Sequence, residues 1–375
     1  MHAELADPRR HSRAVDSELS AHIAARLAAM STQQAATEDR AIDALLTRAL
    51  DTPGEMLLRL FDAAPEPAAY RHLWRRLSHV MAAATPVAAD PLGVVLFALP
   101  LVIVTGCEGT EPVPVRATLF DVQPFAELLR AHDALAGNRN FALSNALVAA
   151  GALELSALPG LRQAAAQAIP AGGEPLALSP AAIAAAPGES VHLRFMVGSA
   201  LCAPGATLLG DAQAGTWAKP MAEALAGALA TDGAHVLALP RAPAPLPSAL
   251  SAGKLAQREV SAQIFVTNAL RRMRASVGEP TAILSAHRLD DGDGELRLSL
   301  SSPFSPRDAE GFRCPLFAFE RVGDAASMLE DLLRDCRVTD VRVQPGVHPD
   351  RVPGSAMPLL FKPDALSGDS ARSNN

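Results

Sequence analysis

The sequence predicts a mixed α/β and α+β protein with an N-terminal helical region, a largely parallel sheet with flanking helices, and a C-terminal α+β part. Three patterns support this fold class. Apolar residues recur at helical spacing in 14–85, strand-like and helix-like segments alternate in 91–245, and two alternating strands surround an Asp/Gly turn in 281–302. The predicted divisions are a helical region at 1–90, a central α/β domain at 91–245, a C-terminal α+β domain at 246–350 and a disordered tail at 351–375.

The N-terminal residues are typical of a small helical bundle. Apolar side chains recur every three or four residues between Leu19 and Met81, and the connections between these stripes are short. Thr52 is the predicted N-cap of a third helix, because Pro53 follows it and Glu55 stands three residues later. Helices joined in this way are expected to be antiparallel neighbours.

The segment 93–109, GVVLFALPLVIVTGCEG, is the most apolar part of the chain. Its uninterrupted apolar run extends over the eleven residues from Val94 to Val104. A helix that spans a bilayer needs about 20 such residues. The run is rich in β-branched side chains and bounded by turn residues, so we predict a strand of a soluble protein, buried on both faces and interrupted at Pro100.

The remainder of the central region predicts alternating helices and strands. Residues 120–135 are amphipathic, residues 141–153 continue in a helical pattern, and residues 161–188 give no clear assignment. A strand at 190–205, a helix at 216–230 and a strand at 233–240 have the order and length of a βαβ unit, which implies parallel pairing.

A Pro-rich linker at 240–253 precedes the C-terminal part, for which we predict the order α, β, β, β, α, β. The turn in this part contains Asp291 and Asp293, followed by Glu295, spaced as in the first half of a calcium loop. Leu296 and Ser302 stand where such a loop requires Gly and Glu, so a hairpin turn is favoured over a calcium site.

The composition argues against some classes of function, nucleic-acid binding among them. The net charge of −7 and the aromatic share of 4% weigh against nucleic-acid binding, which needs basic residues and stacking side chains. The four cysteines are far apart and form no Cys-x-x-Cys pair, as expected of reduced thiols in a cytoplasm. Arg far exceeds Lys among the basic residues, which together with the abundant Ala suggests a GC-rich bacterial genome. No metal, cofactor or membrane contact is predicted.

The turns after the buried strands are the first candidate site. In open α/β sheets, ligands bind beyond the carboxyl ends of the strands, where glycine lets the backbone approach them. The residues that such a site would use are Thr105, Gly106, Gly198, Ser199 and Gly205. Neither turn matches a phosphate-binding motif, and ordinary turns are the simpler interpretation.

Strand histidines are the second candidate. His192, His235 and His287 lie in or beside predicted strands, and they would form a site if those strands were neighbours. His192 and His235 are the two that belong to the same predicted domain as the turn residues. Individually hydrogen-bonded histidines are the simpler interpretation.

Two function classes follow from these patterns. The first is a non-enzymatic, cytoplasmic bacterial binding or assembly protein with a protein partner or a second copy of itself, suggested by the striped N-terminal helices and the missing catalytic motifs. The alternative is a small-molecule-binding enzyme or sensor that uses the turns after the buried strands. No catalytic residue is identified by the sequence.

Overall fold

The structure is a computed structural model, which describes residues 8–361 except 53–54, 65, 87–91, 136–139, 169–174, 204, 207, 210–213, 277, 291, 303–304 and 352–357. The chain forms two compact units, Met1–Gln257 and Arg258–Asn375. The boundary between them falls inside helix α8 (Ser248–Ser276). The finer division into domains that end at residues 90, 245 and 350 remains a prediction.

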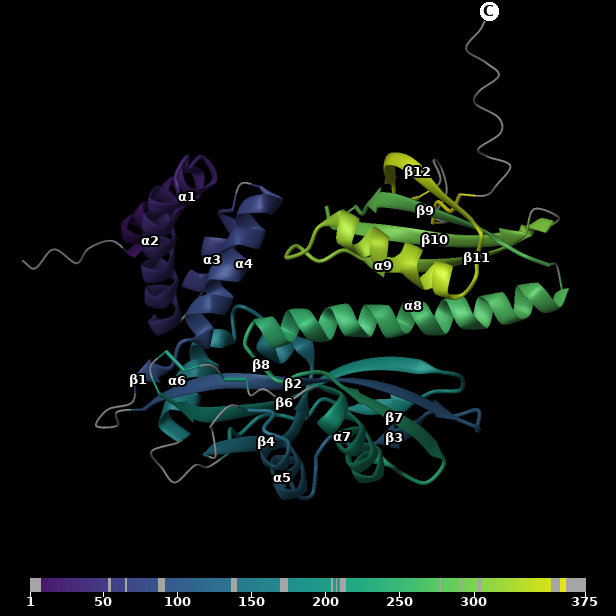
Figure 1. The fold of residues 1–375 in the computed structure, drawn as a ribbon, viewed down its shortest axis with the longest axis horizontal. Helices are drawn as coiled ribbons and strands as arrows, with labels where there is room; N and C mark the ends of the chain where they lie inside the picture. The colour runs from purple at the N-terminus through teal and green to yellow at the C-terminus, as the bar shows by residue number, and fades with distance from the viewer. Residues whose placement is uncertain are drawn as a thin grey trace, which may run out of the picture. The chain divides into compact units, whose positions relative to one another are not determined.

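The first unit begins with four helices, which confirms the predicted helical region (Figure 1). They are α1 (Pro8–Leu27), α2 (Thr32–Asp51), α3 (Met56–Asp62) and α4 (Pro67–Ala82). Ser31 caps α2 by accepting a hydrogen bond from the backbone of Gln34. Thr52 closes α2 with a bond to Arg48 O instead of opening α3, so its predicted role as an N-cap is wrong.

Sheet A of the first unit is built around one long strand, β2 (Gly93–Cys107). One side of β2 pairs with β6 (Ser190–Cys202), which in turn pairs with β4 (Phe141–Val148). The other side pairs successively with β1 (Thr85–Pro86), β8 (Ala244–Pro245) and β7 (Ala234–Pro240). Each of these described pairings is antiparallel, so the prediction of a largely parallel sheet is wrong.

The predicted βαβ unit explains this error. Strand β6, helix α7 (Ala214–Leu229) and strand β7 are all present, and β6 and β7 run in the same direction. They are not neighbours, however, because β2 lies between them: Thr105 pairs with Ser190 of β6 and also with Val236 of β7. The order of elements along the chain indicates strand direction but does not reveal a strand inserted between two others.

Strand β2 passes through Pro100 without a break, contrary to the predicted interruption. The carbonyl oxygen of Pro100 accepts a bond from the backbone N–H of Arg241 at 2.8 Å. Since the N–H and C=O of a strand residue point to the same side, the missing N–H of Pro100 faces the gap between β8, which pairs at Ala98, and β7, which pairs from Leu101.

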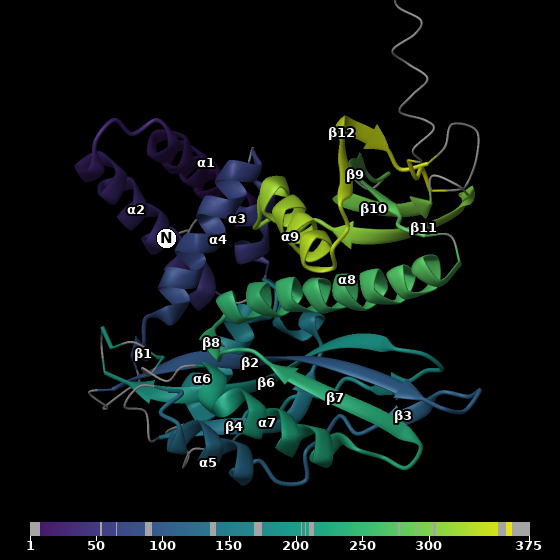
Figure 2. The ribbon, with the colours of Figure 1, turned by 45° about the vertical axis from the view of Figure 1, so that its right-hand side comes forward.

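Both faces of β2 are covered, as its apolar sequence predicts. Alternate residues such as Phe97 and Leu101 pack with α5 (Gln123–Ala131) and α7 on one face (Figure 2). On the opposite face Phe195 of the neighbouring strand lies against Gly253 of α8, and Trp74 of α4 donates to Ser251 Oγ at 2.7 Å. In the described part of the chain, no helix has the length and apolarity needed to cross a membrane.

The remaining elements of the first unit are short. Strand β4 replaces the helix predicted at 141–153, and its outer edge is bonded by residues 117–119 through Leu119 N and Asn145 O. A 3-10 turn (Ala150–Leu153) and α6 (Leu158–Ala168) follow it. Strands β3 (Val113–Val115) and β5 (Ile183–Ala185) form a separate antiparallel pair.

The second unit has the predicted order α, β, β, β, α, β. After α8 come β9 (Thr281–Arg288), β10 (Gly294–Ser302), β11 (Ser305–Pro315), α9 (Val322–Asp335) and β12 (Asp340–Pro349). The strands form sheet E in the order β11-β10-β9-β12, in which β9 and β12 are parallel. One face packs on α8 and α9 through side chains such as Val266, Leu298 and Leu329.

The predicted hairpin turn between β9 and β10 is confirmed. Leu289 N donates to Asp293 O at 2.8 Å, and Gly292 adopts a φ of +92°, which a glycine accommodates without strain. Asp291, the first residue of the rejected calcium pattern, lies outside the described residues. The predicted disordered tail includes Leu359–Phe361, which pack on sheet E; residues 362–375 lie outside the described residues.

Candidate functional site

The turn residues singled out in the sequence lie at two separate places. Because β2 and β6 are antiparallel, their carboxyl ends lie at opposite ends of sheet A. Gly198 pairs with Phe97, and Ser190 pairs with Thr105, eight residues further along β2. At about 3.3 Å per residue, Gly198 lies roughly 26 Å from the position of Thr105 along the sheet. The structure therefore does not bring Gly198 to Thr105.

The three residues predicted at the second turn lie in different local environments. An added Cβ at Gly198 would lie 2.5 Å from Cζ of Phe97, so this glycine makes room for the aromatic ring. Ser199 is buried, with its Oγ lacking a hydrogen-bond partner. Gly205 is exposed beyond the strand with a φ of +78°. None of the three lines either of the two pockets described below.

The end of β2 borders the first of these pockets, which we name the strand-end hollow. It measures about 560 Å³ and contains three of the predicted residues, Thr105, Gly106 and His235. It is lined by residues 104–108, 188–189 and 234–237. Val104 and Leu237 contribute apolar surface, while Glu108, Glu189 and His235 contribute polar groups.

The three strand histidines do not form one cluster. His192 Nε2 lies 3.0 Å from Oγ1 of the buried Thr105, and burial lowers the pKa of His192. His235 pairs with Gly106 and therefore points to the opposite face, where its exposed ring lies 3.7 Å from Glu108. His287 belongs to the second unit. Over the described residues, no three metal-binding side chains come together.

Gly106 and Cys107 shape the hollow through their backbone. An added Cβ at Gly106 would lie 3.1 Å from the carbonyl oxygen of Gly188, and Cys107 N donates to Ala186 O at 3.2 Å. The thiol of Cys107 lies near the carbonyl oxygen of Glu111, on the face opposite to His235. The hollow thus holds no thiol–imidazole pair, and its apolar surface is suited to receive a side chain.

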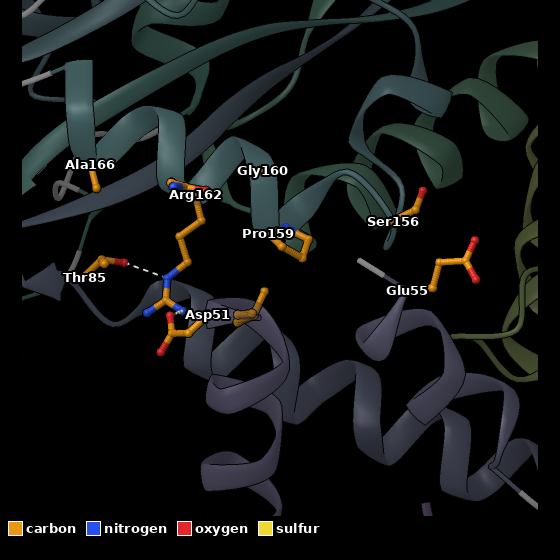
Figure 3. A pocket seen from close by; sticks show the side chains of 10 residues that line it. Asp51, Glu55, Thr85, Ser156, Pro159, Gly160, Arg162 and Ala166 are labelled. Atoms are coloured by element: carbon orange, nitrogen blue, oxygen red, sulfur yellow. Dashed lines mark hydrogen bonds and ion pairs between the residues drawn. The ribbon is translucent and has the colours of Figure 1, made fainter. Parts of the chain in front are cut away.

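A second pocket, the Arg162 pocket, was missed by the sequence analysis (Figure 3). It measures about 570 Å³ and lies between the end of α2 and helix α6. Arg162 donates from Nε to Thr85 Oγ1 at 2.8 Å and from Nη1 to Asp51 Oδ1 at 2.9 Å. Its side chain is 13% exposed, whereas that of Asp51 is 62% exposed. In Figure 3, Ser156 and Glu55 lie on the far side of Pro159 from the guanidinium.

One signal in the sequence marks this pocket. Arg162 is the single charged residue in LPGLRQAAAQA, the sequence of α6. A lone arginine in an Ala/Leu helix requires a polar partner when it is buried. Its partners lie 77 and 111 residues away along the chain, so the sequence could not name them.

Comparison with known proteins gives no match. No family model matches this chain, and neither a curated protein nor a solved structure matches it. The features that bear on function are therefore the geometry of the two pockets and of the strands beside them.

Proposed function

We propose that this chain is a non-enzymatic, cytoplasmic binding or assembly protein that pairs an extended segment of a protein partner with the edge of strand β7. The observation that supports this proposal is an unprotected edge. Within the described residues, β7 pairs with β2 alone; β3 lies near the start of β7, where Val113 approaches Gly233 and Pro114 O accepts a bond from Thr231 Oγ1. Between His235 and Pro240 it carries the sequence VLAL, with no charge and no proline.

Such an edge is unusual in a folded protein. Sheets normally block their edge strands with lysine, proline or a bulge, because exposed backbone N–H and C=O groups recruit another strand. Leu237 of β7 is 53% exposed, although leucine is ordinarily buried. A peptide added to a sheet edge gains affinity from main-chain bonds and specificity from side-chain pockets.

The strand-end hollow supplies a side-chain pocket beside this edge. Leu237 and Val104 would contact an apolar stem, and the carboxylates of Glu108 and Glu189 favour a positively charged end. We infer that the partner segment is extended and carries a Lys or Arg side chain, whose stem is apolar and whose head is charged.

Replacing Leu237 with lysine tests this proposal. A charged side chain at an edge strand opposes pairing, so we expect Leu237→Lys to weaken partner binding at least about tenfold, or 1.4 kcal/mol. Native mass spectrometry of full-length protein purified from its own host would report the bound partner or second copy. The matched control is Val343→Lys, on edge strand β12, where the valine is 61% exposed. The proposal is contradicted if the Leu237→Lys protein still carries the partner. It is also contradicted if the wild-type protein is a monomer without any partner.

A second candidate function is supported by the Arg162 pocket. Its volume lies in the range of small-molecule sites, and a buried guanidinium offers directed donors to a polar ligand. In this alternative the chain is an enzyme or sensor that holds a small molecule away from the predicted strand turns. The turn residues Gly198, Ser199 and Gly205 take no part in it.

For the Arg162 pocket we expect a small molecule to be released when the purified protein is denatured. Arg162→Met should reduce its amount at least about tenfold, because the methionine fills space without donating hydrogen bonds. Mass spectrometry of the extract measures this change, with Arg48→Met as the control: Arg48 lies on α2 in an exposed ion pair with Glu18. Equal release from wild-type and Arg162→Met protein rejects the small-molecule alternative.

A further inference from the structure

The second face of sheet E is polar and nevertheless buried. Residues that alternate with the apolar core positions share this face through their strand pairing: Arg297 lies between Ser285 and Arg313, and Ser299 pairs with Gly311. Ser285, Arg297 and Ser299 are each at most 1% exposed. A polar face of an antiparallel sheet ordinarily lies in water. Something must therefore cover this face.

A short C-terminal segment covers the middle of the face, and we name it the strap: Asp350 together with Leu359–Phe361. Arg297 donates from Nη1 to the backbone oxygens of Asp350 and Leu359, and from Nη2 to the Asp350 carboxylate. Leu359 N donates to Asp350 O at 3.1 Å, which holds the two ends of the strap together. The buried guanidinium thus binds the strap mainly through its main chain.

Two side chains of the strap complete the contact. Leu360 occupies the space that Gly311 leaves, since an added Cβ there would lie 2.7 Å from Leu360 Cδ1. The ring of Phe361 packs against two histidines of the face, with centroid distances of 4.7 Å to His348 and 6.2 Å to His287.

These contacts are consistent with a strap that can leave the polar face of sheet E. The surface beneath is polar and can be hydrated, and Leu359, Leu360 and Phe361 remain partly exposed in the closed position. The closed position also leaves Nε2 of His348 buried without a hydrogen-bond partner. Burying an unpaired polar atom is unfavourable, and opening would let water bind it. Segments with partly exposed contacts open before the rest of a domain unfolds.

His287 is the titratable group best placed to control the strap. Its Nδ1 donates to Pro349 O at 2.9 Å, directly before the strap, so in the neutral ring Nε2 accepts from Ser285 Oγ at 2.8 Å. Burial lowers the pKa of His287. The charged or titratable groups packed around it are Glu295 and Arg297 of β10 and His348 of β12, with Arg313 of β11 and Asp350 of the strap beyond them.

We propose that the strap is an acid-released clasp, which opens when His287 takes up a proton. An imidazolium beside the Arg297 guanidinium and under Phe361 is poorly solvated, and Glu295 offsets this charge only in part because it already pairs with Arg297 and Arg313. Water reaches the ring once the strap leaves.

The direction of the pH effect follows from the difference in the pKa of His287 between the closed and the open form of the strap. Burial in the closed form lowers the pKa of His287, and departure of Phe361 from the ring would let water reach it, so under this proposal the open form binds the proton more tightly. The closed form is therefore fully favoured above the ordinary histidine pKa near 6.5 and loses stability as pH falls below it. Arg297 holds the pKa of Asp350 below its ordinary value of 3.8, so this carboxylate stays ionised between pH 7.5 and pH 5.

Hydrogen exchange of the full-length chain tests the clasp. We expect the protection factor of peptides that contain Leu359–Phe361, corrected for intrinsic exchange, to fall at least about threefold between pH 7.5 and pH 5. Peptides from β10 should stay protected. His287→Gln, which can still donate to Pro349 O, should keep the strap closed at both values. Asp350→Asn keeps both main-chain bonds to Arg297 but loses the ion pair, so it should lower the protection of the strap at both values and retain the pH response.

His235→Gln is the matched control, because His235 is exposed and belongs to the first unit, whereas the strap belongs to the second. This variant should respond to pH as the wild type does. The proposal is overturned by equal protection at pH 7.5 and pH 5, by a wild-type pH response in His287→Gln, or by loss of β10 protection together with that of the strap. If His287→Gln does not fold, the pH profile of the wild type decides: protection of the strap should stay constant above about pH 6.5 and fall below it, and a fall that is complete above pH 6.5 contradicts the clasp.

Discussion

Replacement of Arg297 with methionine is expected to lower the free energy of unfolding of the second unit by about 3–5 kcal/mol. The guanidinium is fully buried in the middle of sheet E. It neutralises the carboxylates of Glu295 and Asp350, whose side chains are 5% and 13% exposed. Methionine removes the positive charge and leaves Glu295 with Arg313, and Asp350 with Arg351, as the nearest cation; both of these arginines are about half exposed.

The matched control for this prediction is Arg313→Met. Arg313 binds the same two acids, but its side chain is 53% exposed, so its replacement should cost less than about 1 kcal/mol. Both tryptophans, Trp74 and Trp217, lie in the first unit, so their fluorescence does not report on sheet E. Hydrogen exchange of β10 in increasing urea measures the second unit directly. Equal stability of the two variants would show that the buried network contributes no more than a surface pair.

The sequence predicts where helices and strands lie along this chain better than it predicts which strands pair with one another. The run from Val94 to Val104 identifies β2 and its burial on both faces, because β-branched residues without alternation are typical of a strand between two layers. Strand pairing depends on contacts between residues that are far apart in sequence, such as Thr105 with Ser190 and Val236. The site expected at two converging strand ends depended on that pairing and is not assembled in the structure.

Two further differences also have causes that are distant along the chain. Half of residues 141–148 are Ala or Leu, which favour helix, yet β4 forms because β6 and residues 117–119 supply backbone partners on both of its sides. Leu359–Phe361 follow a segment with two prolines and a glycine, VPGSAMP, and resemble a tail, but Arg297, 62 residues earlier, binds the backbone of Leu359. The C-terminal order of elements was predicted correctly because its strands alternate clearly and its hairpin turn contains Asp and Gly.

The largest expected effect in the first unit comes from Gly198→Ala, at a residue that the sequence analysis had placed in a ligand site. We expect the free energy of unfolding to fall by about 3 kcal/mol, at the upper end of the usual cost of overpacking. The new Cβ would lie 2.5 Å from Cζ of Phe97 and 2.8 Å from the carbonyl oxygen of Ala142. The ring can move only by disturbing its contact with Phe141, and the carbonyl belongs to the backbone of β4.

Gly227→Ala in α7 is the matched control, since nothing lies within 4 Å of an added Cβ there. This substitution should raise stability by about 0.5–1 kcal/mol through helix propensity. Urea unfolding followed by tryptophan fluorescence measures both variants, because Trp217 packs in the same core as Phe97. In the double variant Phe97→Leu/Gly198→Ala, the cost of the alanine should shrink but not vanish, because the Ala142 carbonyl stays in place. A Gly198→Ala protein as stable as the wild type would mean that β4 and β6 do not approach as closely as this packing requires.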